Sequence, residues 1–159
     1  MAMRAATALT GHMGLELNLL TERPSDLDEL KIAIALHKAH RALLHDGELY
    51  RLDTAPEHLA SGVVARDKSK ALFSFAYMTS DPHVLPGRLR FTGLDQKSSY
   101  RLKLVWPQNW QAVKPPSLIE KLDLTGEGAV FSGGALMQAG MQLPHAQPET
   151  CLLFHLTRE

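Results

Sequence analysis

The chain has 159 residues, of which 45% are hydrophobic and 21% are charged, and its 17 basic residues balance its 17 acidic ones. This composition is typical of a globular domain, and the absence of a basic excess argues against a nucleic-acid partner. The single cysteine, Cys151, excludes an internal disulfide. No segment has the length of a membrane span or the apolar core of a signal peptide. We therefore expect a cytoplasmic protein without a membrane or nucleic-acid partner.

Residues 1–47 have the pattern of an alternating α/β protein. Residues 3–10 are rich in alanine and predict the end of a helix, which Gly11 breaks. In residues 12–19 leucines alternate with polar side chains, and this period of two predicts a β-strand. A single strand leaves both of its hydrogen-bonding edges without partners. We therefore expect residues 1–47 to be a fragment of an alternating α/β protein.

Residues 25–46 predict a long helix that organises the rest of the chain. Ser25 is suited to be its N-cap, and Gly47 is suited to a left-handed C-cap. Two apolar stripes merge around residues 32–36, and a helix that is apolar on two sides is normally buried on two sides. The region before this helix is too short to cover it, so we expect the chain to be one end of a larger protein.

Residues 48–159 predict an antiparallel β-sandwich. Short segments rich in β-branched, aromatic and leucine residues alternate with turn residues, and no long helix interrupts them. The predicted strands are ELYRLD, GVVARD, KALFSFAYMT, RLRFTG, SYRLKLVW, AVFSG, LMQAGMQL and TCLLFHLT. Residues 106–116 are the least regular stretch and predict a long connection. The fold class is therefore mainly β, with a fragment of an α/β protein in front of a sandwich.

Two groups of polar residues in the first 47 were weighed as sites. Three histidines, His37, His40 and His45, lie on the long helix, but no cysteine or carboxylate completes a ligand set, so we expect no metal. If the strand belongs to a (β/α)8 barrel, Glu16 and Asn18 point inward near the C-terminal end of the strand, where active sites of such barrels lie. A substrate-facing role and a structural role inside the barrel both remain open for these two residues.

The sandwich region offers no catalytic motif. The sequence Ser132-Gly133-Gly134 lacks the G-x-S-x-G pattern and is better interpreted as a turn. Four aromatic residues were considered as a sugar-stacking platform, although packing in the core is the commoner use of such side chains. They are Tyr77, Tyr100, Trp106 and Trp110.

The chain resembles the C-terminal part of bacterial α-galactosidases of glycoside hydrolase family 36. The resemblance is carried, in this order, by AMRAATALTGHMGLELNLL, ELKIAIALHKAHRALLHDGELYRLD, VVARDKSKALFSFAYM, PGRLRFTGLD and FSGGALMQAGMQLP. It implies a three-part enzyme in which a central (β/α)8 barrel hydrolyses terminal α-galactosides with retention. In that case residues 1–47 are the C-terminal remnant of the (β/α)8 barrel, in which residues 11–46 supply its last strand and helix, and residues 48–159 are the C-terminal sandwich.

The resemblance also implies that the catalytic aspartates lie upstream of this region, so no catalytic residue and no cofactor is assigned here. Asp26, Asp28, Asp46 and Asp53 match no catalytic motif. The first hypothesis is therefore a non-catalytic part of an α-galactosidase that supports fold and assembly. Its partners would be the missing barrel, the parent's oligosaccharide substrate and a second copy in a homo-oligomer. The second is a freestanding carbohydrate-binding or structural module.

Overall fold

The computed structural model describes residues 1–80, 86–110 and 117–159. The helices are α1 (Ala2–Leu9), α2 (Pro24–Asp46), α3 (Leu118–Lys121) and α4 (Gly133–Gln138). The strands are β1 (Glu48–Leu52), β2 (His58–Val64), β3 (Lys70–Tyr77), β4 (Arg88–Leu89), β5 (Ser99–Trp106), β6 (Ala129–Ser132), β7 (Met141–Gln142) and β8 (Thr150–Arg158). Six of these strands form one antiparallel sheet in the order β1-β2-β3-β8-β5-β6, and β4 pairs with β7 in a small second sheet.

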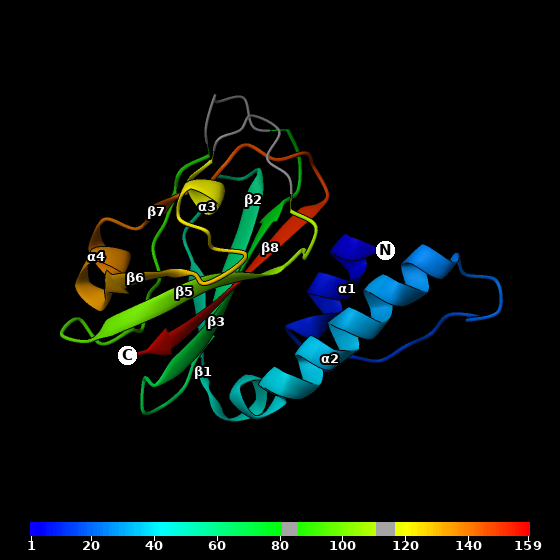
Figure 1. Ribbon diagram of the computed structural model, residues 1–159, viewed down its shortest axis with the longest axis horizontal. Helices are drawn as coiled ribbons and strands as arrows, with labels where there is room; N and C mark the ends of the chain where they lie inside the picture. The colour runs from blue at the N-terminus through cyan, green and yellow to red at the C-terminus, as the bar shows by residue number, and fades with distance from the viewer. Residues whose placement is uncertain (81–85, 111–116) are drawn as a thin grey trace.

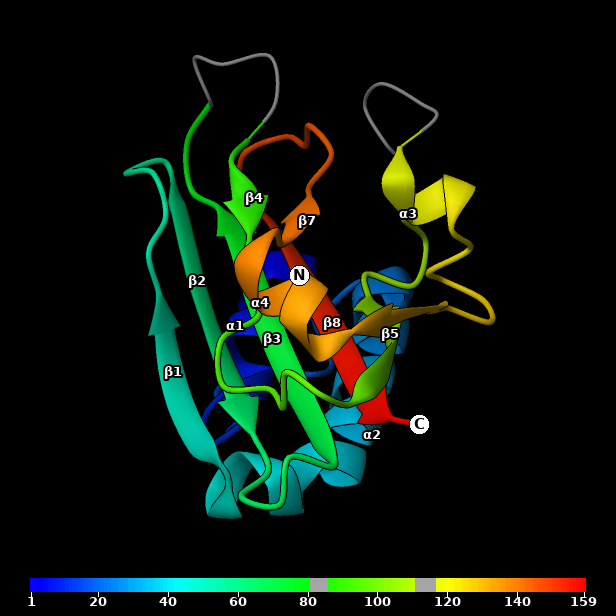
Figure 2. The ribbon, with the colours of Figure 1, turned by 90° about the vertical axis from the view of Figure 1, so that its left-hand side faces the viewer.

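The large sheet is covered on both faces. Helices α1 and α2 lie on one face, whereas β4, β7 and α4 lie on the other (Figures 1 and 2). The central strand β8 contains the continuous apolar run 151–154, all of it buried, as is typical of a strand that packs on both sides. The layer opposite the helices is therefore a two-stranded sheet with helical turns, and not a complete second sheet. The expectation of a predominantly antiparallel β fold is confirmed.

Two separate cores result from this arrangement. The larger core lies between the sheet and the β4–β7 layer and contains Phe73, Phe91 and Phe154. Rings of Phe73 and Phe91 meet edge to face, with their centroids 5.1 Å apart. The smaller core lies under the helices, where small residues such as Ala6 and Ala33 allow a close approach to the sheet. Alternate residues along each strand face these two cores, which explains why β3 and β8 are almost entirely buried.

The long helix has the predicted extent, but its two ends are built differently from the expectation. Arg23 is the N-cap and Pro24 opens the helix, because proline fits the first turn, where an amide hydrogen is not needed. Gly47 is extended (φ −77°) and not left-handed. A Cβ at this position would lie 2.6 Å from Val63 Cγ1 and 2.7 Å from the Leu43 carbonyl oxygen. The glycine is therefore required for close packing and not for its backbone angles.

Two other predicted elements differ in the structure. Residues 12–19 form no strand and run as an irregular segment, because the alternation 12–19 specifies two faces but provides no neighbouring strand for the backbone to pair with. The predicted strand LMQAGMQL is instead the end of α4 followed by the short β7. The Ser132 hydroxyl accepts a hydrogen bond from the Ala135 amide (3.1 Å), so the predicted turn is a helix N-cap. Of the predicted connection 106–116, residues 111–116 lie outside the described residues.

The buried hydroxyl of Tyr100 gives a first test of this packing. It donates to the Lys68 carbonyl (2.8 Å) and accepts from the Asp95 amide (3.0 Å), and the residue is completely buried. We expect Tyr100→Phe to lower the free energy of unfolding by about 2 kcal/mol, because both backbone groups lose a partner. The control is Tyr50→Phe, whose hydroxyl bonds the exposed Glu48 carboxylate and whose loss should cost under about 1 kcal/mol. Equal shifts of the urea midpoint would contradict this account.

Candidate functional site

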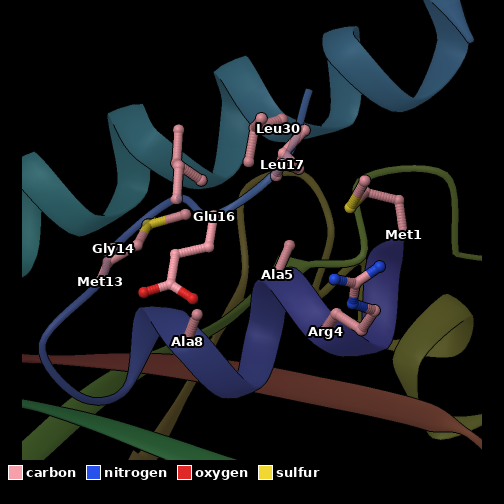
Figure 3. A pocket seen from close by; sticks show the side chains of 10 residues that line it. Met1, Arg4, Ala5, Ala8, Met13, Gly14, Glu16, Leu17 and Leu30 are labelled. Carbon is pink, nitrogen blue, oxygen red and sulfur yellow. The ribbon is translucent and has the colours of Figure 1, made fainter. Parts of the chain in front are cut away.

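A cavity of about 400 Å³ lies between α1 and α2. The irregular segment that follows α1 runs back between the two helices and forms one wall, so that Leu17 lies close to Leu30 of α2 (Figure 3). Arg4 and Ala8 of α1 line the opposite wall. The cavity therefore has walls of mixed polarity, with one cationic and one anionic side chain, Arg4 and Glu16, among the lining residues.

The two predicted substrate-facing residues do not share this cavity. Glu16 lines it, and its exposed carboxylate points toward Ala8 (Figure 3). Asn18 is also exposed, but its side-chain oxygen accepts a hydrogen bond from the Leu20 amide (3.1 Å) and thereby closes a local turn. Contact with a substrate stays a prediction for both residues.

The three histidines of α2 have three different neighbours. His37 Nδ1 lies 3.2 Å from the Leu9 carbonyl oxygen at the end of α1. The rings of His40 and His155 have centroids 4.6 Å apart, and those of His45 and His12 are 4.7 Å apart. Within residues 1–80, 86–110 and 117–159, no group of three histidine, cysteine or carboxylate side chains could hold a metal ion.

His155 is the residue that the sequence analysis missed. It interrupts the apolar run of β8 and faces α2, where burial lowers the pKa of its imidazole to about 4, with further lowering by His40, Lys70 and Lys103. The signal in the sequence was a histidine directly after the apolar run 151–154 of this strand. Its partner is on another element, so spacing along the chain could not identify the pair.

A second groove, of about 460 Å³, runs along the other side of α1 over β2 and β3. Its lining is largely apolar and includes Met3, Leu59, Met78 and Cys151. Burial raises the pKa of the Cys151 thiol to about 12, so this cysteine is an inert packing residue and not a nucleophile. Leu59 and Met78 are exposed at 62% and 42%, so this face of the sheet is only partly covered by α1 and α2.

The four aromatic residues form no exposed platform. Tyr77, Tyr100 and Trp106 are each at most 2% exposed and belong to the two cores. Trp110 is half-buried and packs against the larger core. Because stacking on a sugar requires an accessible ring face, these residues serve packing.

Two aspartates near the start of α2 are held in local ion pairs. Asp26 bonds Arg23 Nε at 2.7 Å, and Asp28 bonds Lys31 Nζ at 2.9 Å. Neither residue lines the cavity between α1 and α2. Asp46 and Asp53 are exposed, and neither lines that cavity. The structure therefore provides no reason to assign a catalytic function to any of the four.

Comparison with known proteins identifies the class to which this fold belongs. Residues 58–156 match the model of the glycosyl hydrolase family 36 C-terminal domain, which is more than half of the chain. The chain therefore belongs to glycosyl hydrolase family 36, as the resemblance of its sequence predicted.

The relatives found are α-galactosidases. An alpha-galactosidase of Escherichia coli is 34% identical over 99% of this chain, and the alpha-galactosidase AgaA of Geobacillus stearothermophilus is 26% identical over 89% of it. The galactosidase domain of the alpha-galactosidase-sucrose kinase AgaSK has the same fold, with a TM-score of 0.79 and 23% identity over 98% of this chain and 19% of that one. An alpha-galactosidase of Lactobacillus brevis gives a TM-score of 0.76 at 23% identity, over 98% of this chain and 20% of that one.

The chain spans only part of the curated relatives that it matches: 23% of the E. coli protein and 17% of AgaA. Among its described residues, it contains no helix with the length and apolar character needed to span a membrane.

Proposed function

We propose that this chain acts as the C-terminal, non-catalytic part of an α-galactosidase. The parent enzyme would hydrolyse terminal α-galactosides with retention, by way of a covalent galactosyl-enzyme. The observation that carries the proposal is the match of residues 58–156 to the family 36 C-terminal domain. Residues 12–19 between α1 and α2 support it, since they have the alternation of a strand but no neighbouring strand in this chain with which to pair.

In such an enzyme the chemistry belongs to two carboxylates that lie outside this chain. One would attack the anomeric carbon while the other protonates the departing glycosidic oxygen, and the second would then activate water to release galactose. The residues described above provide neither group. The proposed role of this chain is therefore to support the fold and assembly of the barrel.

The surface of the sheet supports this role. Leu49 and Leu59 are exposed at 66% and 62%, and the apolar groove beside α1 extends between the helix and these strands. Exposed apolar surface of this kind marks a contact with another protein surface. We propose that the barrel of the parent enzyme covers this surface, and that a second copy of the chain covers it when the barrel is absent.

A chimera tests the proposal. The catalytic portion of the E. coli relative would be joined to this chain in place of its own matching C-terminal segment, with the truncated enzyme as control. We expect the chimera, and not the truncated enzyme, to hydrolyse an aryl α-galactoside and to release the α-anomer of galactose first, as proton NMR can detect. A folded chimera that is no more active than the truncated enzyme would contradict the proposal.

The nucleotide sequence upstream of the Met1 codon provides a second test that does not depend on folding. We expect an open reading frame that continues upstream and encodes the strands of a barrel with two catalytic aspartates. A stop codon immediately upstream, in the same frame, would exclude the proposed parent enzyme. The chain would then be a small protein without an assigned enzymatic role.

The isolated chain is expected to have no α-galactosidase activity. The physical reason is that hydrolysis needs two carboxyl groups on opposite sides of one glycosidic bond, and this chain provides no such site. The measurement is release of nitrophenol from a nitrophenyl α-galactoside by purified chain, with the E. coli relative as the positive control. Turnover that co-purifies with chain of the correct mass would contradict the assignment of a non-catalytic role.

A further inference from the structure

The contact between α2 and the large sheet contains an unusual pair of titratable groups. His40 on α2 and His155 on β8 pack against each other, with ring centroids 4.6 Å apart and a 54° angle between the ring planes. Both residues are half-buried. Strand β8 lies in the middle of the sheet, between β3 and β5, so this contact is at the centre of the helix-covered face.

The charged groups around this pair are cations. On β5, Lys103 is the direct cross-strand partner of His155. On β3, Leu72 is its partner, and Lys70 lies two residues away on the same face. On α2, the neighbouring titratable residues are His37, which contacts the Leu9 carbonyl, and the exposed Arg41. Further along β5, Arg101 is already paired with Glu159, at 2.8 Å.

We propose that His40 and His155 form an acid-sensitive contact that holds the C-terminal half of α2 on the sheet at neutral pH and releases it in mildly acidic solution. In the neutral form the two imidazoles pack as flat, partly apolar rings. A proton on either ring places a half-buried positive charge beside a second imidazole and two lysines. Since like charges repel and burial penalises a charge, the contact changes from favourable to unfavourable.

The direction of the effect follows from the protonation equilibria. Burial, and then Lys70, lowers the pKa of His40, and burial, followed by His40 and the two lysines, lowers that of His155 to about 4. The unfolded or released state has the ordinary histidine pKa of about 6.5 and therefore binds protons first as the pH falls. The stabilisation is thus complete above about pH 6.5 and is lost progressively as the pH falls toward the pKa of the packed pair.

Hydrogen exchange of the purified chain measures the release directly. We compare amide exchange at about pH 5 and about pH 7.5, corrected for the intrinsic rate at each pH and at constant ionic strength. We expect protection of α2 residues 34–46 to fall at least about tenfold relative to that of β3 and β8. A tenfold change corresponds to a difference of about one pKa unit between the packed and the released state of a histidine. Equal loss of protection in α2 and the sheet would overturn the proposal, because it would indicate ordinary global unfolding.

A variant series identifies the groups responsible. We expect the double variant His40→Gln/His155→Gln to remove most of the pH dependence of α2 protection, and each single variant to remove part of it. The matched control is His12→Gln, which makes the same change in the other histidine pair of α2, His12 and His45, whose rings are 4.7 Å apart; because both residues are exposed, this variant should leave the dependence intact. If the folded double variant keeps the full dependence, the pair is not the sensor. If the double variant fails to fold, a chemical-shift titration of the His155 ring protons in the wild-type chain decides the question: an apparent pKa above about 6.5 would overturn the proposal.

Discussion

Gly133→Ala is expected to lower the free energy of unfolding by about 3 kcal/mol, the largest effect that we predict for the loss of a single glycine. Gly133 is buried at the start of α4, and its amide donates to the Ser98 carbonyl at 2.8 Å. A Cβ at this position would overlap the carbonyl oxygen of Asp95 and would lie 3.1 Å from the ring of Tyr100. The backbone at Asp95 cannot move aside without breaking the hydrogen bonds that hold the loop before β5 against the start of α4.

The neighbouring glycine provides the control for this prediction. A Cβ on Gly134 would have an ordinary contact with the Gln96 carbonyl oxygen, at 3.4 Å. Gly134→Ala should therefore change the stability by less than about 1 kcal/mol, since alanine is also the better helix former. Urea unfolding followed by circular dichroism gives both values. Similar losses for the two variants would show that steric overlap at Asp95 is not the cause.

Phe73→Ala is expected to lower the free energy of unfolding by about 4 kcal/mol, because it removes a completely buried ring from the centre of the larger core. Phe73 contacts Phe91 edge to face, and its ring lies over Gly62, its cross-strand partner in β2. The control is Phe131→Ala on the edge strand β6, where a half-buried ring should cost about half as much. Thermal or urea unfolding of both variants measures the difference.

The pair Gly62 and Phe73 also predicts a non-additive result. A Cβ on Gly62 would lie 2.8 Å from Phe73 Cγ and closer still to other ring atoms, so Gly62→Ala should be destabilising by itself. In the double variant the ring is absent and the added methyl group has space. The double variant should therefore lose less stability than the sum of the single variants. A strictly additive result would mean that the ring does not determine the need for glycine at this position.

Helices α1 and α2 and the longer strands could be predicted from the sequence because their signals are local. The apolar stripes of 25–46 specify α2, and the apolar run of β8 specifies a strand buried on both faces. The alternation of 12–19 is as clear, yet no strand forms, since a strand also needs neighbours with free backbone groups. The segment LMQAGMQL has apolar residues that suit either a helix or a strand. The Ser132 N-cap and the tight fit of Gly133 determine that its first residues are helical.

The candidate site was less predictable than the fold. Glu16 and Asn18 were selected from an expected position in a barrel, and of these two residues Glu16 alone lines the cavity between α1 and α2. The pairing of His40 with His155 depends on how α2 lies across the sheet, and no spacing within one element encodes that angle. His37 and His40 look like neighbours on a helical face, but the fold directs them to α1 and to β8, respectively.

The position of β8 between β3 and β5 has a consequence for the order in which the fold can form during translation. Five of the six strands of the large sheet are synthesised before β8, yet none of them joins the β1–β3 group to the β5–β6 pair. Until residues 150–158 leave the ribosome, the nascent chain therefore presents two incomplete sheets with open inner edges. A product that ends before these residues would have two aggregation-prone edges. Pairing of β8 with β3 and β5 is therefore the step that completes the sheet and allows the domain to fold.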